Sequence, residues 1–195
     1  MDGLSFPPAE FDRRLIGIRE KMKDAKLGAL IVTRGENIFY GSGFRASHFA
    51  SWLSELHALV IPLSGAPRLM TRALEREAAR LQWTDAPHLY MDHENGYDVL
   101  HRILSESGNT AATVGIEERC LKVSQLRKMQ SRLPLASLVD ASGLVESVAA
   151  NPSRAESECL RNAGRITNIG SQTRIEALGE GAAKRRYQTM LVDRF

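Results

Sequence analysis

The chain has 195 residues, of which 43% are hydrophobic and 25% charged. These are ordinary values for a globular protein that can hold one domain and part of a second. The net charge is only +3, and the first 150 residues carry 18 basic and 18 acidic side chains. We therefore expect no nucleic-acid partner, because that part has no basic excess to attract phosphates.

Membrane and secretion signals are also missing from the sequence. No stretch approaches 18 consecutive apolar residues, so we expect no membrane partner. The first 15 residues lack the apolar core of a signal peptide. The two cysteines, Cys120 and Cys159, have no Cys/His cluster near them, which predicts free thiols and a cytoplasmic location.

The first half of the chain predicts a helix followed by three strands. Apolar side chains recur at helical spacing through residues 8–26, at Phe11, Leu15, Ile18 and Met22. Residues 27–33 are a short apolar run, typical of a strand that is buried on both faces. Residues 35–37 then predict a turn. Further on, residues 57–62 and 68–71 predict a hairpin around Gly65.

The second half predicts alternating helices and strands. Helices are expected at residues 73–83, 97–106 and 124–133, with Asp92 and Ser124 as capping residues, and strands at 87–91, 113–116 and 136–139. A long helix is expected over 153–178, opened by a capping box of Ser153 and Glu156. Its aliphatic residues are expected near one side of the helix: Leu160, Ala163, Ile166, Ile169 and Ile175.

This alternation predicts an α/β fold with a mixed, largely parallel sheet flanked by helices and one antiparallel hairpin. Pro152 biases Asn151 away from helix and marks a boundary. We therefore expect an α/β domain over residues 1–150, followed by a linker and the first helix of a second domain over residues 151–195.

Five segments in order resemble the amino-terminal domain of the creatinase/prolidase superfamily, whose members include Xaa-Pro aminopeptidases. The quoted segments are Arg14–Thr33 (RLIGIREKMKDAKLGALIVT), Glu36–Phe44 (ENIFYGSGF), Leu59–Arg72 (LVIPLSGAPRLMTR), Val114–Glu117 (VGIE) and Asp140–Gly170, which opens DASGLVES. The last segment resembles the junction at which that family passes into its "pita-bread" catalytic domain.

The resemblance implies a non-catalytic portion of a metal-dependent hydrolase that acts on C–N bonds of peptides or guanidino compounds. It implies a homodimer, and a divalent metal (Mn, Co or Zn) only in the catalytic domain. No motif for the metal ligands is present, so we expect no cofactor, no metal ligand and no catalytic residue in this chain, and no activity by the chain alone.

One loop is a candidate site on the same resemblance. In several members a loop of this domain reaches the active site of the partner subunit. The matching segment, residues 44–55, contains Phe44, Arg45, His48, Phe49 and Trp52. An arginine beside aromatic rings is suited to hold a carboxylate or guanidino group, so these five are the candidate substrate-gating residues.

Other motifs favour structural interpretations. The sequence Gly41-Ser42-Gly43 has the spacing of a dinucleotide fingerprint but lacks its following acidic residue, and predicts a turn. Asp92-His93-Glu94 cannot all face one ion, because adjacent side chains point in different directions.

Two other functions stay open. The chain could be a standalone binding or regulatory module that has lost its catalytic half, or an α/β enzyme with an unrecognised site. After Leu178 the sequence departs from the family, with Lys184-Arg185-Arg186 where acidic residues are expected. This departure suggests a truncated or frameshifted end.

Overall fold

The computed structural model describes residues 6–46 and 56–177. The chain divides into two compact units, residues 1–150 and 151–195. The helices of the first unit are α1 (Pro8–Asp24), α2 (Gly35–Ser42), the 3-10 turn η1 (Ala73–Glu75), α3 (Arg76–Ala79), α4 (Gly96–Glu106), α5 (Val123–Arg132) and α6 (Leu144–Ala149). Its strands are β1 (Ala29–Val32), β2 (Ala58–Pro62), β3 (Arg68–Arg72), β4 (His88–Tyr90), β5 (Thr113–Ile116) and β6 (Ser137–Asp140). The second unit contains α7 (Arg154–Ala177).

The six strands form one mixed sheet in the order β4-β3-β2-β1-β5-β6. Strands β1, β5 and β6 are parallel, and so are β3 and β4. The expected α/β fold with a largely parallel sheet is confirmed. The expected antiparallel hairpin is also confirmed as β2 and β3. Strand β2 also pairs antiparallel with β1, which was not expected from the sequence. Because β1 and β2 are separated by α2 instead of a short turn, no local sequence pattern predicts their antiparallel pairing.

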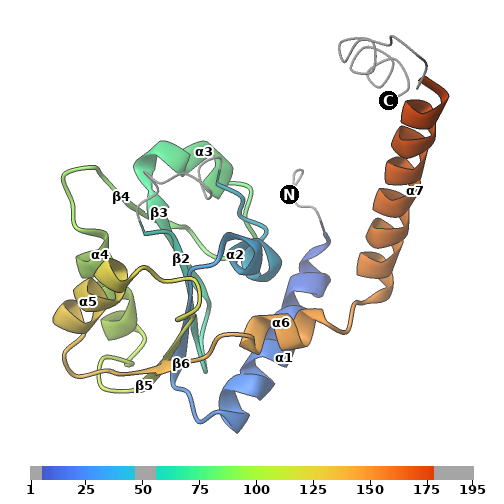
Figure 1. Cartoon of the computed structure of the whole chain (residues 1–195). Helices are drawn as coiled ribbons and strands as arrows, with labels where there is room; N and C mark the ends of the chain where they lie inside the picture. The colour runs from blue at the N-terminus through green and yellow to red at the C-terminus, as the bar shows by residue number, and fades with distance from the viewer. Residues whose placement is uncertain (1–5, 47–55, 178–195) are drawn as a thin grey trace. The chain divides into compact units, whose positions relative to one another are not determined.

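Helices cover both faces of the sheet (Figure 1). On one face α4 and α5 pack on the strands through Leu100, Ile103 and Met129. On the other face α1, α2 and α6 supply Ile18, Ile38 and Val145. Successive residues of β1 point to opposite faces, and all four are buried. The apolar run at residues 27–33 therefore is a strand enclosed by two helical layers, as its composition predicts.

Residues 35–37 form the first turn of helix α2, so the expectation of a turn at this position is wrong. Arg34 is the extended residue before the helix, and Gly43, with a φ of 78°, ends it in the left-handed region. The side chain of Arg34 makes no capping hydrogen bond to the helix. The cap comes from a carboxylate about 80 positions further along the chain, which no local pattern reveals.

Three other helices differ from expectation in their extent or their capping residue. The segment 73–83 is helical only as η1 and the single turn of α3, and its Leu74 is 72% exposed. Helix α4 is capped by Asn95, whose side chain accepts from Tyr97 N at 3.0 Å, and not by Asp92. Helix α5 begins at Val123, after the N-cap residue Lys122, so the expectation that Ser124 caps this helix is wrong.

The second unit begins with the expected capping box. Ser153 N donates to Glu156 Oε2 at 2.7 Å, and Glu156 N donates to Ser153 Oγ at 3.1 Å. Helix α7 carries four exposed aliphatic side chains: Leu160, Ile166, Ile169 and Ile175. At about 100° per residue they wind around the helix instead of lying near one side, which corrects the expected single stripe. Within the described ranges no helix is long and apolar enough to cross a membrane.

Candidate functional site

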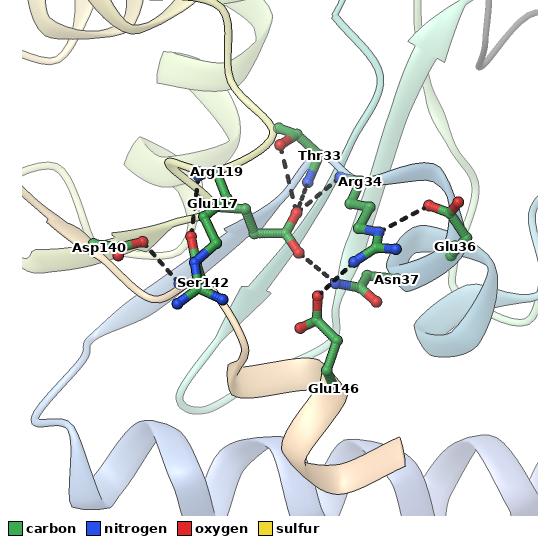
Figure 2. A network of polar contacts seen from close by, with 9 residues as sticks. All are labelled: Thr33, Arg34, Glu36, Asn37, Glu117, Arg119, Asp140, Ser142 and Glu146. Atoms are coloured by element: carbon green, nitrogen blue, oxygen red, sulfur yellow. Dashed lines mark hydrogen bonds and ion pairs between the residues drawn. The ribbon is translucent and has the colours of Figure 1, made fainter. Parts of the chain in front are cut away.

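The buried carboxylate of Glu117 is the centre of a polar network at one edge of the sheet (Figure 2). Glu117 follows β5 directly, and Thr33 follows the parallel strand β1. Glu117 Oε2 accepts from Thr33 N at 2.6 Å and from Arg34 N at 2.8 Å, and Oε1 accepts from Asn37 Nδ2 at 2.5 Å. The carboxylate therefore joins β5 to β1 and caps the positive end of α2.

Arg34 connects this network to helix α6. Its guanidinium lies between two carboxylates, donating from Nε to Glu36 Oε2 and from Nη1 to Glu146 Oε1, each at 3.0 Å. Glu36 belongs to α2 itself, whereas Glu146 belongs to α6. These two carboxylates raise the pKa of Arg34, with Glu36 contributing most.

A third parallel strand adds Asp140 to the same edge. Ser142 N donates to Asp140 Oδ1 at 2.9 Å, and Arg119 N donates to Ser142 Oγ at 3.2 Å. The carboxyl ends of β1, β5 and β6 therefore meet where ligands commonly bind in α/β sheets. Here the polar groups of that edge bind one another.

The electrostatics of this edge oppose acid–base catalysis. Hydrogen bonds from the Ser142 side chain and backbone lower the pKa of Asp140. Burial alone would raise the pKa of Glu146, but hydrogen bonds from its own backbone, Asn37 and Arg34 outweigh burial and lower it. Carboxyl groups held ionised in this way are poor general acids at neutral pH.

Cys120 lies near the same edge and is exposed. Although the residue is exposed, partial burial of its sulfur raises the pKa of the thiol, and the nearby Glu117 carboxylate raises it further. A raised pKa leaves less thiolate at neutral pH, so Cys120 is not an activated nucleophile.

The candidate loop begins and ends at neighbouring points on the domain. Phe44 is fully buried, and its ring centroid lies 6.4 Å from that of His57. Phe44 N donates to Ser42 Oγ at 3.1 Å, which fixes the start of the loop to the end of α2. At the other end, the Leu56 carbonyl accepts from Tyr90 Oη at 2.8 Å. Residues 44 and 57 are thus held side by side by buried groups.

Among the five candidate residues, Phe44 packs in the core and Arg45 is exposed. His48, Phe49 and Trp52 lie outside the described residues. The structure therefore places two of the five.

Arg14 is a buried arginine that contacts helix α2. Arg14 is 2% exposed, and its guanidinium carbon lies 4.4 Å from the ring centroid of Phe6, 5.1 Å from that of Phe11 and 4.5 Å from that of Tyr40. Arg14 Nη1 donates to the Tyr40 carbonyl at 2.9 Å, and Nε donates to Glu10 Oε1 at 3.3 Å. The cation therefore joins α1 to the last turn of α2. A predicted amphipathic helix gives no signal that one of its arginines is enclosed by aromatic rings, two of which, Phe6 and Tyr40, lie outside the helix.

Metal ligands are a separate question. In the part of the chain that the structure describes, no three His, Cys, Asp or Glu side chains come together in a way that could hold a metal ion. The described residues therefore offer no ligand set for the divalent metal that the resemblance implies for a catalytic domain.

The comparison with known families decides the identity of the domain. Residues 14–148 match the family "Creatinase/Prolidase N-terminal domain". The chain belongs to this family. This creatinase/prolidase amino-terminal domain is 26% identical over 182 residues to creatinase from Bacillus sp. (strain B-0618), and 28% identical over 193 residues to the "Uncharacterized hydrolase/peptidase y4tL" of Sinorhizobium fredii. These alignments include about 90% of the present chain but only 42% and 47% of the relatives. The chain therefore spans less than half the length of these relatives.

Solved structures show the same fold. The domain resembles recombinant prolidase from Thermococcus sibiricus with a TM-score of 0.76 at 19% identity, covering 93% of this chain and 48% of that one. The N-terminal domain of the cytoplasmic peptidase PepQ from Mycobacterium tuberculosis matches with a TM-score of 0.55 at 24% identity, covering 70% of this chain and 98% of that domain.

Proposed function

We propose that the chain is the non-catalytic amino-terminal portion of a creatinase/prolidase-type metallohydrolase, acting in dimerisation and substrate gating. The family match over residues 14–148 carries this proposal. The relatives are roughly twice as long as the matched region, which supports a second domain as the place of the chemistry. The names creatinase and prolidase favour guanidino compounds or small peptides as substrates of the longer protein. We assign C–N bond hydrolysis and its divalent metal (Mn, Co or Zn) to that second domain, and propose a cytoplasmic location.

The loop after Phe44 is the proposed contribution of this domain to substrate selection. Support comes from its two ends, since Phe44 contacts His57 across them and the Leu56 carbonyl is fixed to β4 by the Tyr90 hydroxyl. Fixed ends restrict where a connecting loop can reach, which lowers the entropic cost of presenting its side chains. Arg45, the exposed first cation of the loop, is the residue suited to bind a substrate carboxylate.

In the longer protein that carries this domain, Arg45→Ala and Trp52→Ala are expected to change substrate selection. Loss of one charge-assisted hydrogen bond costs about 1.5–3 kcal/mol, so we expect KM to rise about tenfold or more for a substrate with a free carboxylate. Steady-state kinetics with paired substrates that have and lack this carboxylate measure the effect. Arg127→Ala, an exposed arginine on α5, is the matched control and should leave KM unchanged. Unchanged kinetics in both loop variants would contradict the gating role.

The exposed aliphatic side chains of α7 support a homodimer. Leu160 and Ile175 are 64% and 67% exposed, and burying each such side chain is worth about 1.5–3 kcal/mol. We therefore expect the 195-residue chain to associate through residues 153–178, as measured by light scattering at tens of micromolar. A version that ends at Ala150 should be monomeric. A monomeric full chain, or a dimer that persists without the helix, would place the interface elsewhere.

A further inference from the structure

Three of the segments that resemble the family meet in one polar network. They contribute Asn37 from the second segment, Glu117 from the fourth and Glu146 from the last (Figure 2). The contacts join two short helices, α2 and α6, that are more than 100 positions apart in the chain.

Neither helix is long enough to be stable alone. Helix α2 has eight residues and α6 has six, whereas isolated helices shorter than about 12–15 residues are marginal in water. Helix α2 is fixed by Glu117 at its start and by buried Ile38 in its middle. Helix α6 follows the N-cap residue Gly143, which has a φ of 90°, and buries Val145. Each helix therefore depends on its neighbours to stay formed.

The polar link between the two helices runs through Glu146. Its Oε1 accepts from Arg34 Nη1 at 3.0 Å, and the pKa of its carboxyl group is lowered in part by Asn37. Asn37 is 6% exposed and also donates to Glu117. The Glu146 side chain is 40% exposed, so the ion pair is only partly screened by solvent.

The two linked helices lie directly before the candidate loop and before the second unit. Helix α2 leads directly into Phe44, and α6 is the last helix before Asn151 and Pro152, where the second unit begins. We propose that Glu146 is a positioning residue that couples α6 to α2, so that the last helix before the second unit and the helix before Phe44 open and close together. The coupling stands on these contacts alone, whatever the longer protein acts upon.

Hydrogen exchange of the 195-residue chain, resolved at single amides by NMR, tests the coupling. In α2, Ile38 N donates to the Arg34 carbonyl and Gly43 N to the Phe39 carbonyl; in α6, Ser147 N donates to the Gly143 carbonyl and Ala150 N to the Glu146 carbonyl. Glu146→Gln is expected to lower the protection of both α2 amides about threefold, the size of a partly exposed ion pair. Arg34→Gln should lower the protection of both α6 amides by a similar factor.

Two further variants separate coupling from general destabilisation. The charge swap Arg34→Glu with Glu146→Arg should restore protection in both helices. Glu36→Gln removes the other carboxylate partner of Arg34 without touching α6, and should leave Ser147 and Ala150 unchanged. Amides of β1, a fully buried central strand that we expect to exchange only through global opening, serve as the reference. If each substitution affects only amides of its own helix, or if Glu36→Gln equals Glu146→Gln in its effect on α6, the proposal is wrong.

Discussion

Replacing Glu117 by alanine is expected to lower the free energy of unfolding by about 3–5 kcal/mol. The substitution removes the acceptor for three donors, Thr33 N, Arg34 N and Asn37 Nδ2, in a site where the side chain is only 2% exposed. Each buried donor left without a partner costs about 1–3 kcal/mol. Chemical denaturation followed by circular dichroism measures the change.

Two variants show whether this loss comes from the network. Glu117→Gln keeps the shape and one acceptor oxygen, so it should fall between the wild type and Glu117→Ala. Glu118→Ala removes the exposed carboxylate next in the chain and should change stability by less than about 0.5 kcal/mol. A Glu117→Ala protein as stable as Glu118→Ala would show that the network contributes nothing to the fold.

Replacing Arg14 by alanine is the second large expected loss, about 3 kcal/mol. The change removes a desolvated cation from three aromatic rings, and each such contact is worth about 0.5–2 kcal/mol. It also removes the hydrogen bond to the Tyr40 carbonyl and leaves a cavity. Urea denaturation is the measurement.

Arg13 provides the matched control, because it binds the same Glu10 Oε1 at 2.7 Å while its side chain is 40% exposed. Arg13→Ala should cost less than about 1 kcal/mol, as exposed ion pairs do. Arg14→Lys keeps the charge but not the planar group that stacks on the rings, so it should recover only part of the loss. Equal effects at the two arginines would contradict the importance of the aromatic enclosure.

The strands could be predicted from the sequence because their signal is local. The runs at residues 29–32 and 113–116 are short, largely apolar and followed directly by a polar residue, and both become strands covered by helices on each side. The capping box of Ser153 and Glu156 was predictable for the same reason, since both partners lie within one helical turn.

Helix α2 could not be predicted, because its cap is not local. Gly35-Glu36-Asn37 has the composition of a turn, and the carboxylate that caps the helix is supplied by Glu117 from another strand. The burial of Arg14 has the same origin, since Phe6 and Tyr40 come from outside its helix. The sequence therefore indicates the loop as a candidate site. It does not reveal the Glu117 network or the aromatic enclosure of Arg14, both of which contact helix α2.

A turnover assay of the purified 195-residue chain tests the central claim most directly. The substrates are an Xaa-Pro dipeptide and creatine, each with and without added Mn²⁺, Co²⁺ or Zn²⁺, and an intact relative such as the Bacillus creatinase is the positive control. The described residues contain no three-residue group that could hold a metal ion, and hydrogen bonds lower the pKa of the Asp140 and Glu146 carboxyl groups. We predict no turnover above the blank under any of these conditions. Metal-dependent turnover that a chelator abolishes would contradict the assignment of this chain as a non-catalytic domain.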